Sequence, residues 1–250
     1  MDEAARRAEG PPPARRALEV LAEGRVEVRG RMPWSSNATF LVDVCHDGLT
    51  LPAIYKPHRG ERPLWDFPDG LHLREVAAYR LSEALGWGVV PETVARTEGP
   101  LGAGSLQRFV PADFAQHYFT LLERPELHGA LRTICTFDLV ANNADRKGGH
   151  CLLDEDGRVW GIDNGLCFHV DPGLRTVIWD FAGEAVPDPL LADLDRLVTG
   201  VGAGGFVAGL DGLLAPEEVA AMLRRAGAVL HHRRFPDPGP SGRAYPWPLV

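Results

Sequence analysis

Apolar and polar residues alternate in two early segments of the chain, RVEVR at 25–29 and TFLVDV at 39–44. Alternation of this kind gives a strand one apolar and one polar face, so both segments are predicted to be strands. The apolar stretch LPAIY at 51–55 indicates a third strand, which is followed by Lys56 and Pro57. Because proline cannot donate a ladder hydrogen bond, this strand is expected to stop there or to lie at a sheet edge.

The first long helix is predicted over His72–Leu85, where apolar residues recur with helical spacing and Gly86 follows as a C-cap. Residues 17–23 indicate a short helix or the lead into the first strand. Further strands are expected at 89–97 and 104–110. The first 110 residues therefore predict a β-rich lobe with one major helix.

Helical spacing dominates the rest of the chain. Helices are expected at 127–142, 189–198 and 216–226, and a strand hairpin at 151–153 and 159–162. The glycine-rich stretch at 200–205 lacks the lysine of a phosphate loop, so it is interpreted as an ordinary loop. We thus predict an α+β fold with a flexible N-terminus at 1–16, an N-lobe at 17–110, and a mainly helical C-lobe at 111–250 with an extended proline-rich tail from about 235.

The composition is that of an average globular protein, since 45% of the 250 residues are hydrophobic and 24% are charged. No apolar run reaches 18 residues and no secretory signal is recognisable, so stable membrane insertion is not expected. A net charge of −8 without a block of cations disfavours nucleic acid as a partner. The four cysteines form no CxxC pair, which favours reduced thiols and a cytoplasmic location.

Two aspartates flank the predicted hairpin. Asp145 follows a helix in the sequence NNADR, and Asp163 follows the second short strand in GIDNG. Each could be an ordinary turn residue, because aspartate favours turns and helix ends. Together they could orient a hydroxyl acceptor and hold Mg²⁺ on phosphates, as phosphoryl transfer requires.

Lys56 ends an apolar strand, and Glu75 follows on the predicted helix. A strand-end lysine can neutralise nucleotide phosphates, and a helix glutamate can orient it through an ion pair. The alternative is a solvated lysine and a glutamate that stabilises the first helical turn. The neighbouring Arg74 is expected to be solvated.

The turn between the first two strands contains Ser35, Ser36 and Asn37. Small residues let backbone amides and hydroxyl groups approach a phosphate closely. An ordinary polar turn would have the same composition.

The motifs AIYKP, REVAAYRL, LQRFV, NNADRKGGHCLL and GIDNG occur in this order between roughly residues 25 and 170. This order resembles the phosphatidylinositol 3-/4-kinase-like branch of the protein-kinase fold, and in particular its small actinobacterial members. Secretory-pathway kinases and HipA-type kinases contain similar elements. The resemblance implies a two-lobed kinase-like fold that binds ATP and a divalent metal ion.

The resemblance also implies roles for single residues. Lys56 corresponds to the ATP-phosphate lysine, Glu75 to its helix partner, and Asp145 to the catalytic aspartate. Asp163 corresponds to the metal-binding aspartate. The residues that cover the phosphates or read the adenine edge through the backbone correspond to Ser35, Ser36, Asn37, Gln107, Arg108, Phe109 and Val110.

One position departs from the family pattern. The second metal ligand is usually an asparagine five residues after the catalytic aspartate, and here that residue is His150. Imidazole is a poor Mg²⁺ ligand, so His150 could favour Mn²⁺, bind a phosphate, or only contact the nucleotide. Asn143 or Asn164 could supply an oxygen ligand instead.

We therefore expect an ATP- and metal-dependent kinase that acts on a protein or small-molecule hydroxyl. The alternatives are a nucleotide-binding pseudokinase with a partner-binding role, a phosphatidylinositol-type lipid kinase and an AMP transferase. The lipid alternative is less favoured, because residues 166–184 contain one arginine and no lysine.

Overall fold

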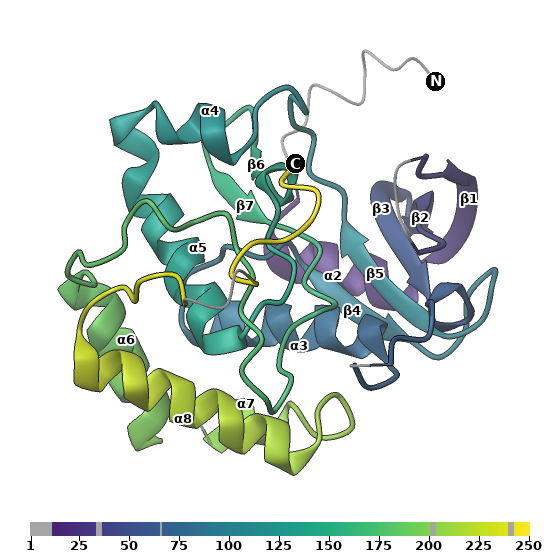
Figure 1. The fold of residues 1–250 in the computed structure, drawn as a ribbon. Helices are drawn as coiled ribbons and strands as arrows, with labels where there is room; N and C mark the ends of the chain where they lie inside the picture. The colour runs from purple at the N-terminus through teal and green to yellow at the C-terminus, as the bar shows by residue number, and fades with distance from the viewer. Residues whose placement is uncertain (1–11, 34–36, 66, 201–203, 240–242) are drawn as a thin grey trace. The chain divides into compact units, whose positions relative to one another are not determined.

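The computed structural model describes residues 12–33, 37–65, 67–200, 204–239 and 243–250 (Figure 1). A five-stranded antiparallel sheet has the strand order β1-β2-β3-β5-β4. Its strands are β1 (Arg25–Arg31), β2 (Phe40–His46), β3 (Leu49–Pro57), β4 (Thr93–Arg96) and β5 (Gly104–Arg108). The strands predicted from alternation are thus confirmed, although the one expected at 89–97 contains only residues 93–96.

Strand β3 lies in the interior of this sheet, between β2 and β5. Its side chains alternate between buried and half-buried positions, as the apolar pattern requires. The strand ends at Pro57, where the ladder loses a donor, and Lys56 is paired in register with Ser105 of β5. The sheet therefore fixes the backbone on both sides of Lys56.

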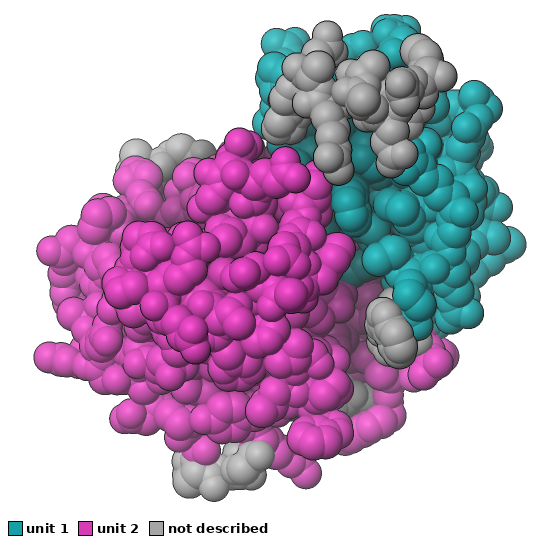
Figure 2. Space-filling model, turned by 90° about the horizontal axis from the view of Figure 1, so that it is seen from above, with its two compact units in different colours: residues 1–61, 92–109 teal, residues 62–91, 110–250 magenta. Residues whose placement is uncertain are grey.

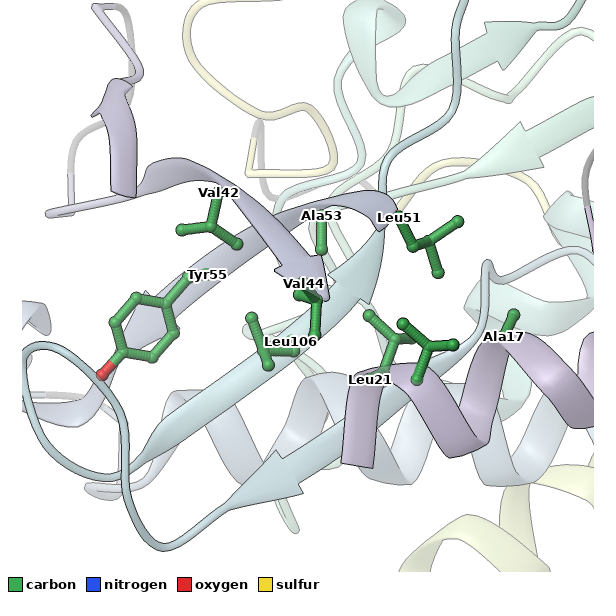
Figure 3. Packing of buried hydrophobic residues seen from close by; sticks show 9 residues of the cluster. Ala17, Leu21, Val42, Val44, Leu51, Ala53, Tyr55 and Leu106 are labelled. Atoms are coloured by element: carbon green, nitrogen blue, oxygen red, sulfur yellow. The ribbon is translucent and has the colours of Figure 1, made fainter. Parts of the chain in front are cut away.

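Helix α2 (Ala14–Glu23) packs on the sheet through Ala17, Val20 and Leu21, which are completely buried. Figure 3 shows Ala17 and Leu21 beside side chains of β2, β3 and β5. The cluster that they join contains Val42, Val44, Leu51, Ala53, Tyr55 and Leu106. The prediction of a flexible 1–16 segment is wrong for residues 14–16, which are helical, and residues 1–11 lie outside the described part of the chain.

Apolar periodicity predicted four of the other helices, namely α3 (Leu71–Ala84), α5 (His128–Ala141), α6 (Asp188–Thr199) and α8 (Pro216–His232). The short helices α4 (Tyr118–Leu122) and α7 (Gly204–Ala208) were not predicted. Short 3-10 turns are η1 (His58–Gly60), η2 (Pro125–Leu127) and η3 (Gly148–His150). The predicted loop at 200–205 is wrong at its end, because α7 begins at Gly204, and residues 201–203 are outside the described ranges.

A two-stranded antiparallel hairpin pairs β6 (Cys151–Leu153) with β7 (Val159–Gly161), as expected. Sheets and helices are both well represented, so the α+β prediction is confirmed. Within the described ranges, no helix combines the length and the apolar character needed to cross a membrane.

The chain forms two compact units (Figure 2). Unit 1 contains residues 1–61 and 92–109, and unit 2 contains residues 62–91 and 110–250. Helix α3 therefore groups with the later helices, whereas the division predicted at residue 110 assigns it to the N-lobe. The functional lobe boundaries stay a prediction.

The proline-rich tail belongs to unit 2, and its described residues, 236–239 and 243–250, contain no helix or strand. The carbonyl of Ala244 accepts hydrogen bonds from the Thr176 amide (3.0 Å) and the Trp179 indole (3.1 Å). The carbonyl of Leu249 accepts one from the Gly148 amide at 2.7 Å. The end of the described chain thus lies against the loop that follows Asp145.

Candidate active site

The open end of the β6–β7 hairpin brings His150 and Asp163 together in unit 2. The amide of Ile162 donates to the carbonyl of His150 at 3.0 Å, which continues the ladder by one rung. The next residue, Asp163, then places its Oδ2 atom 3.3 Å from Nε2 of His150. His150 and Asp163, which are separated in sequence by the hairpin, are therefore in direct side-chain contact.

Asp145 lies in the loop between α5 and η3. Helix α5 is followed by its C-cap, Asn142, in a left-handed conformation (φ 56°), and the side chain of Asn143 accepts a hydrogen bond from the Asp145 amide at 2.9 Å. The Asp145 carboxylate pairs with the Lys147 ammonium at 3.2 Å. These contacts fix both the backbone and the carboxylate of Asp145.

Partial burial raises the pKa of the Asp145 carboxyl. The Lys147 ammonium works against this shift, and the negative charge of Asp163 adds to it. A carboxylate with a raised pKa is the type of group that can accept a proton from a hydroxyl substrate.

Arg146 is completely buried and connects the parts of the site. Its guanidinium donates to both oxygens of Asp138 on α5, at 2.9–3.2 Å. It also donates to the carbonyl of Ile162 and to Oδ1 of Asn164, both at 2.7 Å. Burial raises the pKa of Asp138 although the charge of Arg146 opposes that shift. The loop carrying Asp145 is thereby tied to both residues that flank Asp163.

Asp163 itself has a left-handed backbone (φ 57°), an uncommon conformation for a residue with a side chain. Glu75 of α3 holds the following residue, because its Oε2 atom accepts the amide hydrogen of Asn164 at 3.0 Å. The Asn164 side chain also donates to the carbonyl of Gly161 at 3.1 Å. Backbone strain of this kind persists only where surrounding bonds enforce it, and it is concentrated at functional sites.

Unit 2 thus gathers four of the predicted site residues, namely Asp145, Asp163, His150 and, through Asn164, Glu75. Lys56 lies on β3 of unit 1, and Asn37 lies between β1 and β2 of the same unit. Ser35 and Ser36 fall outside the described residues.

The stretch predicted to read adenine belongs largely to the sheet of unit 1. The Gln107 side chain is buried and donates to Thr93 at 2.9 Å, and Arg108 pairs with Glu92 at 2.5 Å. The amides of Arg108 and Phe109 donate to the carbonyls of Glu92 (2.8 Å) and Pro52 (3.0 Å). Both amides are therefore engaged within unit 1. The nucleotide role of the stretch, which continues to Val110, stays a prediction.

The expectation that Arg74 is solvated is wrong. Its guanidinium is buried, pairs with Glu218 of α8 and donates to the carbonyl of Cys167 at 2.8 Å. An arginine can be buried inside a helical unit when a glutamate from another helix pairs with its charge. The helical pattern of α3 alone could not identify that distant partner.

Three residues of the site were missed by sequence reasoning: Asp138, Arg146 and Lys147. A signal existed for Asp138, since it is a carboxylate within the otherwise apolar stretch FDLVA of α5. A charge in such a place needs a partner, and the arginine eight residues later was available. Lys147 could have been noted as a cation two residues after Asp145.

The fold resembles solved kinases. Hydra Fam20 with sugar has a TM-score of 0.59 and 14% identity, covering 87% of this chain and 87% of that structure. The golgi casein kinase has a TM-score of 0.52 and 14% identity (88% and 75% covered), and the Helicobacter pylori proinflammatory kinase CtkA has 0.50 and 11% (86% and 94%). At these identities the likeness shows the fold alone, which confirms the kinase-like prediction.

No protein-family model matches the sequence. Protein Rv2133c of Mycobacterium tuberculosis (strain ATCC 25618 / H37Rv) is a relative by sequence, with 41% identity over 264 residues. The alignment covers 92% of this chain and 94% of the relative. A match of this identity and coverage means that this chain, whose fold is kinase-like, belongs to the same family as Rv2133c.

Proposed function

We propose that the protein is an ATP- and metal-dependent phosphotransferase that acts on a hydroxyl group of a protein or small molecule. The observation that carries this proposal is that Asp145 and Asp163 lie in two segments that the buried Arg146 holds together at one end of a short hairpin. The kinase-like fold supports it. Two carboxylates with separate hydrogen-bond environments are what phosphoryl transfer needs from the protein.

In this proposal Asp145 orients the acceptor hydroxyl and accepts its proton. Its raised pKa suits that task, because a stronger base holds the proton more firmly after transfer. Lys147 keeps the carboxylate in place at 3.2 Å and adds positive charge beside the reacting group. Lys56 is assigned to the ATP phosphates, as the sequence resemblance implies. Catalysis would then depend mostly on positioning and charge neutralisation.

The residues around Asp163 fit a divalent metal ion. Asp163 is half exposed, whereas the neighbouring carboxylates Asp138 and Glu75 are buried and engaged with Arg146 and the Asn164 amide. Asp163 and His150 are therefore the residues that would hold the ion. When bound, such an ion neutralises the charge on the ATP phosphates.

The test compares Asp145→Asn with Asp156→Asn in the intact chain. Asp156 is an exposed carboxylate in the turn of the same hairpin, so its variant is the matched control. We expect Asp145→Asn to lower autophosphorylation or ADP release by about 100- to 10,000-fold, the usual contribution of a general base. ATP affinity should change little, and Asp156→Asn should match the unaltered protein. Lys56→Ala should weaken ATP binding itself.

Some results would contradict the proposal. Equal transfer by both aspartate variants would remove Asp145 from the reaction. Tight ATP binding without transfer to protein, small-molecule or lipid hydroxyls would favour the pseudokinase alternative. The mass added to the product separates phosphoryl transfer from AMP transfer.

A further inference from the structure

We propose that the metal site of this chain has a nitrogen ligand, and that His150 and Asp163 together select Mn²⁺ over Mg²⁺. The inference rests on the proposed function only for the position of the metal site. What it adds is which ion the two residues prefer. It starts from the contact between Nε2 of His150 and Oδ2 of Asp163, which are 3.3 Å apart.

The other ring nitrogen of His150 determines what Nε2 can do. Nδ1 lies 3.0 Å from the carbonyl oxygen of Asp145 and 3.4 Å from the amide nitrogen of Lys147. The shorter contact is to an acceptor, so the hydrogen-bond geometry assigns the hydrogen to Nδ1. In the neutral ring, Nε2 then presents a lone pair. Metal-binding histidines typically donate their second ring N–H to a carbonyl or carboxylate in this way.

A lone pair on Nε2 facing a carboxylate oxygen is unfavourable unless a cation lies near both atoms. Two atoms bound to one metal ion at roughly 2.0–2.2 Å are separated by about 3 Å, which is close to the observed contact. His150 is largely buried, with 14% of its side chain exposed, whereas Asp163 is 51% exposed. The imidazole is thus held among buried neighbours, and the carboxylate is accessible from solvent.

The oxygen ligands that could replace the imidazole are already used. Oδ1 of Asn143 accepts the Asp145 amide at 2.9 Å, and Oδ1 of Asn164 accepts from Arg146 at 2.7 Å. Both asparagines are almost completely buried. Turning either side chain toward a metal ion at Asp163 would break a bond that holds the loop. His150 is therefore the side chain left to complete the site with Asp163.

This ligand pair determines the metal preference. Mg²⁺ favours oxygen ligands in near-octahedral geometry, whereas imidazole is a ligand of first-row transition metals, among which Mn²⁺ shares with Mg²⁺ the preference for carboxylate and water as the other ligands. An asparagine at position 150 would offer an oxygen instead. We therefore expect His150→Asn to lower the ratio of Mn²⁺ to Mg²⁺ affinity by about tenfold or more, the scale on which ligand surroundings change metal affinity.

The experiment uses the intact chain with Mn²⁺, in the presence and absence of ADP. Electron paramagnetic resonance counts free Mn²⁺ and gives its affinity, and competition gives that of Mg²⁺. Pulsed measurements on bound Mn²⁺ detect the nitrogen of a directly bound imidazole. The control is His46→Asn, because His46 lies 3.5–3.8 Å from the carboxylates of Glu19, Glu23 and Asp47 and could bind Mn²⁺ separately.

The expected result is a nitrogen signal that is lost in His150→Asn and kept in His46→Asn. Asp163→Asn gives a second variant with the same prediction, should His150→Asn fail to fold. Bound Mn²⁺ without a nitrogen signal, or an unchanged metal preference in His150→Asn, would overturn the inference. Nitrogen-ligated Mn²⁺ without phosphoryl transfer would contradict the proposed function alone. Transfer with Mg²⁺ and no nitrogen signal would contradict only the metal assignment.

Discussion

Arg146 and Asp138 form a charged pair with almost no solvent exposure, and both ends of the pair have further hydrogen bonds. Compared with an apolar pair of similar size at the same place, a buried ion pair adds little net stability, because both charges lose their hydration. Removal of one partner is much worse, since the other charge stays buried and unpaired. The main effect of the pair is therefore to fix the conformation of the loop, and its net contribution to the stability of the protein is small.

We expect Arg146→Met to lower the free energy of unfolding by about 3–5 kcal/mol, the usual effect of leaving a buried charge unpaired. The double variant Arg146→Met with Asp138→Leu should recover much of this loss while transfer activity stays low. Urea unfolding measures the free energies of unfolding of the single and double variants, and a transfer assay measures their activity. The control is Arg124→Met, whose ion pair with Glu126 is exposed and should contribute less than about 1 kcal/mol. Equal losses in the two single variants would contradict this account.

Asp145 is expected to reduce stability at neutral pH. Burial raises its pKa in the folded protein above the unfolded value, so ionisation is more costly in the folded state. Its destabilising effect is absent below the unfolded pKa and grows as the pH rises through the folded pKa. Asp145→Asn should therefore raise the melting temperature at neutral pH, with a smaller gain in acid.

Melting curves of Asp145→Asn and Asp156→Asn across the acidic to neutral range measure this difference. Transfer activity of the unaltered protein should rise with pH through the raised pKa of Asp145. A melting temperature that falls in Asp145→Asn at neutral pH would show that the pair with Lys147 outweighs burial.

At the residue scale, Asp145 and Asp163 were singled out because they flank a recognisable hairpin, and His150 because it departs from the pattern of the resembled family; their roles stay predictions. Sequence reasoning missed Arg146 and its partner, and it gave Arg74 the wrong environment. In both cases the partner is a residue on another element, as with Glu218 on α8. Local patterns show that a charge is present, but only the tertiary structure shows what neutralises it.

At the scale of elements, helix α2 is the clearest example of a short helix stabilised by its contacts. Ten residues are marginal for an isolated helix, so the buried face of α2 must supply most of the stabilisation. Strand and helix predictions worked best where apolar periodicity was long, as in α3 and α5. The five-residue helices α4 and α7 were missed, because so few residues show no usable period.

We expect Leu21→Ala to lower the free energy of unfolding by about 2–5 kcal/mol, since the side chain is completely buried against the sheet. Val28→Ala on β1 is the control. Val28 is 46% exposed, and its truncation should change stability by less than about 0.5 kcal/mol. Denaturant unfolding followed by circular dichroism measures both, and a small effect of Leu21→Ala would show that α2 contributes little to unit 1.

At the scale of the whole molecule, the α+β class followed from the order of strands and helices. The kinase-like type did not follow from periodicity; it required the order of short motifs from AIYKP to GIDNG. The grouping of α3 with unit 2 was not predicted, because the sequence places α3 before β4 and β5. Chain order and spatial order differ wherever a segment leaves one unit and returns.

The distribution of the cysteines has a practical consequence at this scale. Cys135, Cys151 and Cys167 are buried in unit 2, and burial raises the pKa of Cys151 to about 12. Cys45, in unit 1, is half-buried. Because only thiolates react quickly with alkylating reagents, a fluorescent label should enter at Cys45 first. The rate at which the other three react afterwards reports how often unit 2 opens, so the chain contains its own probes of local unfolding.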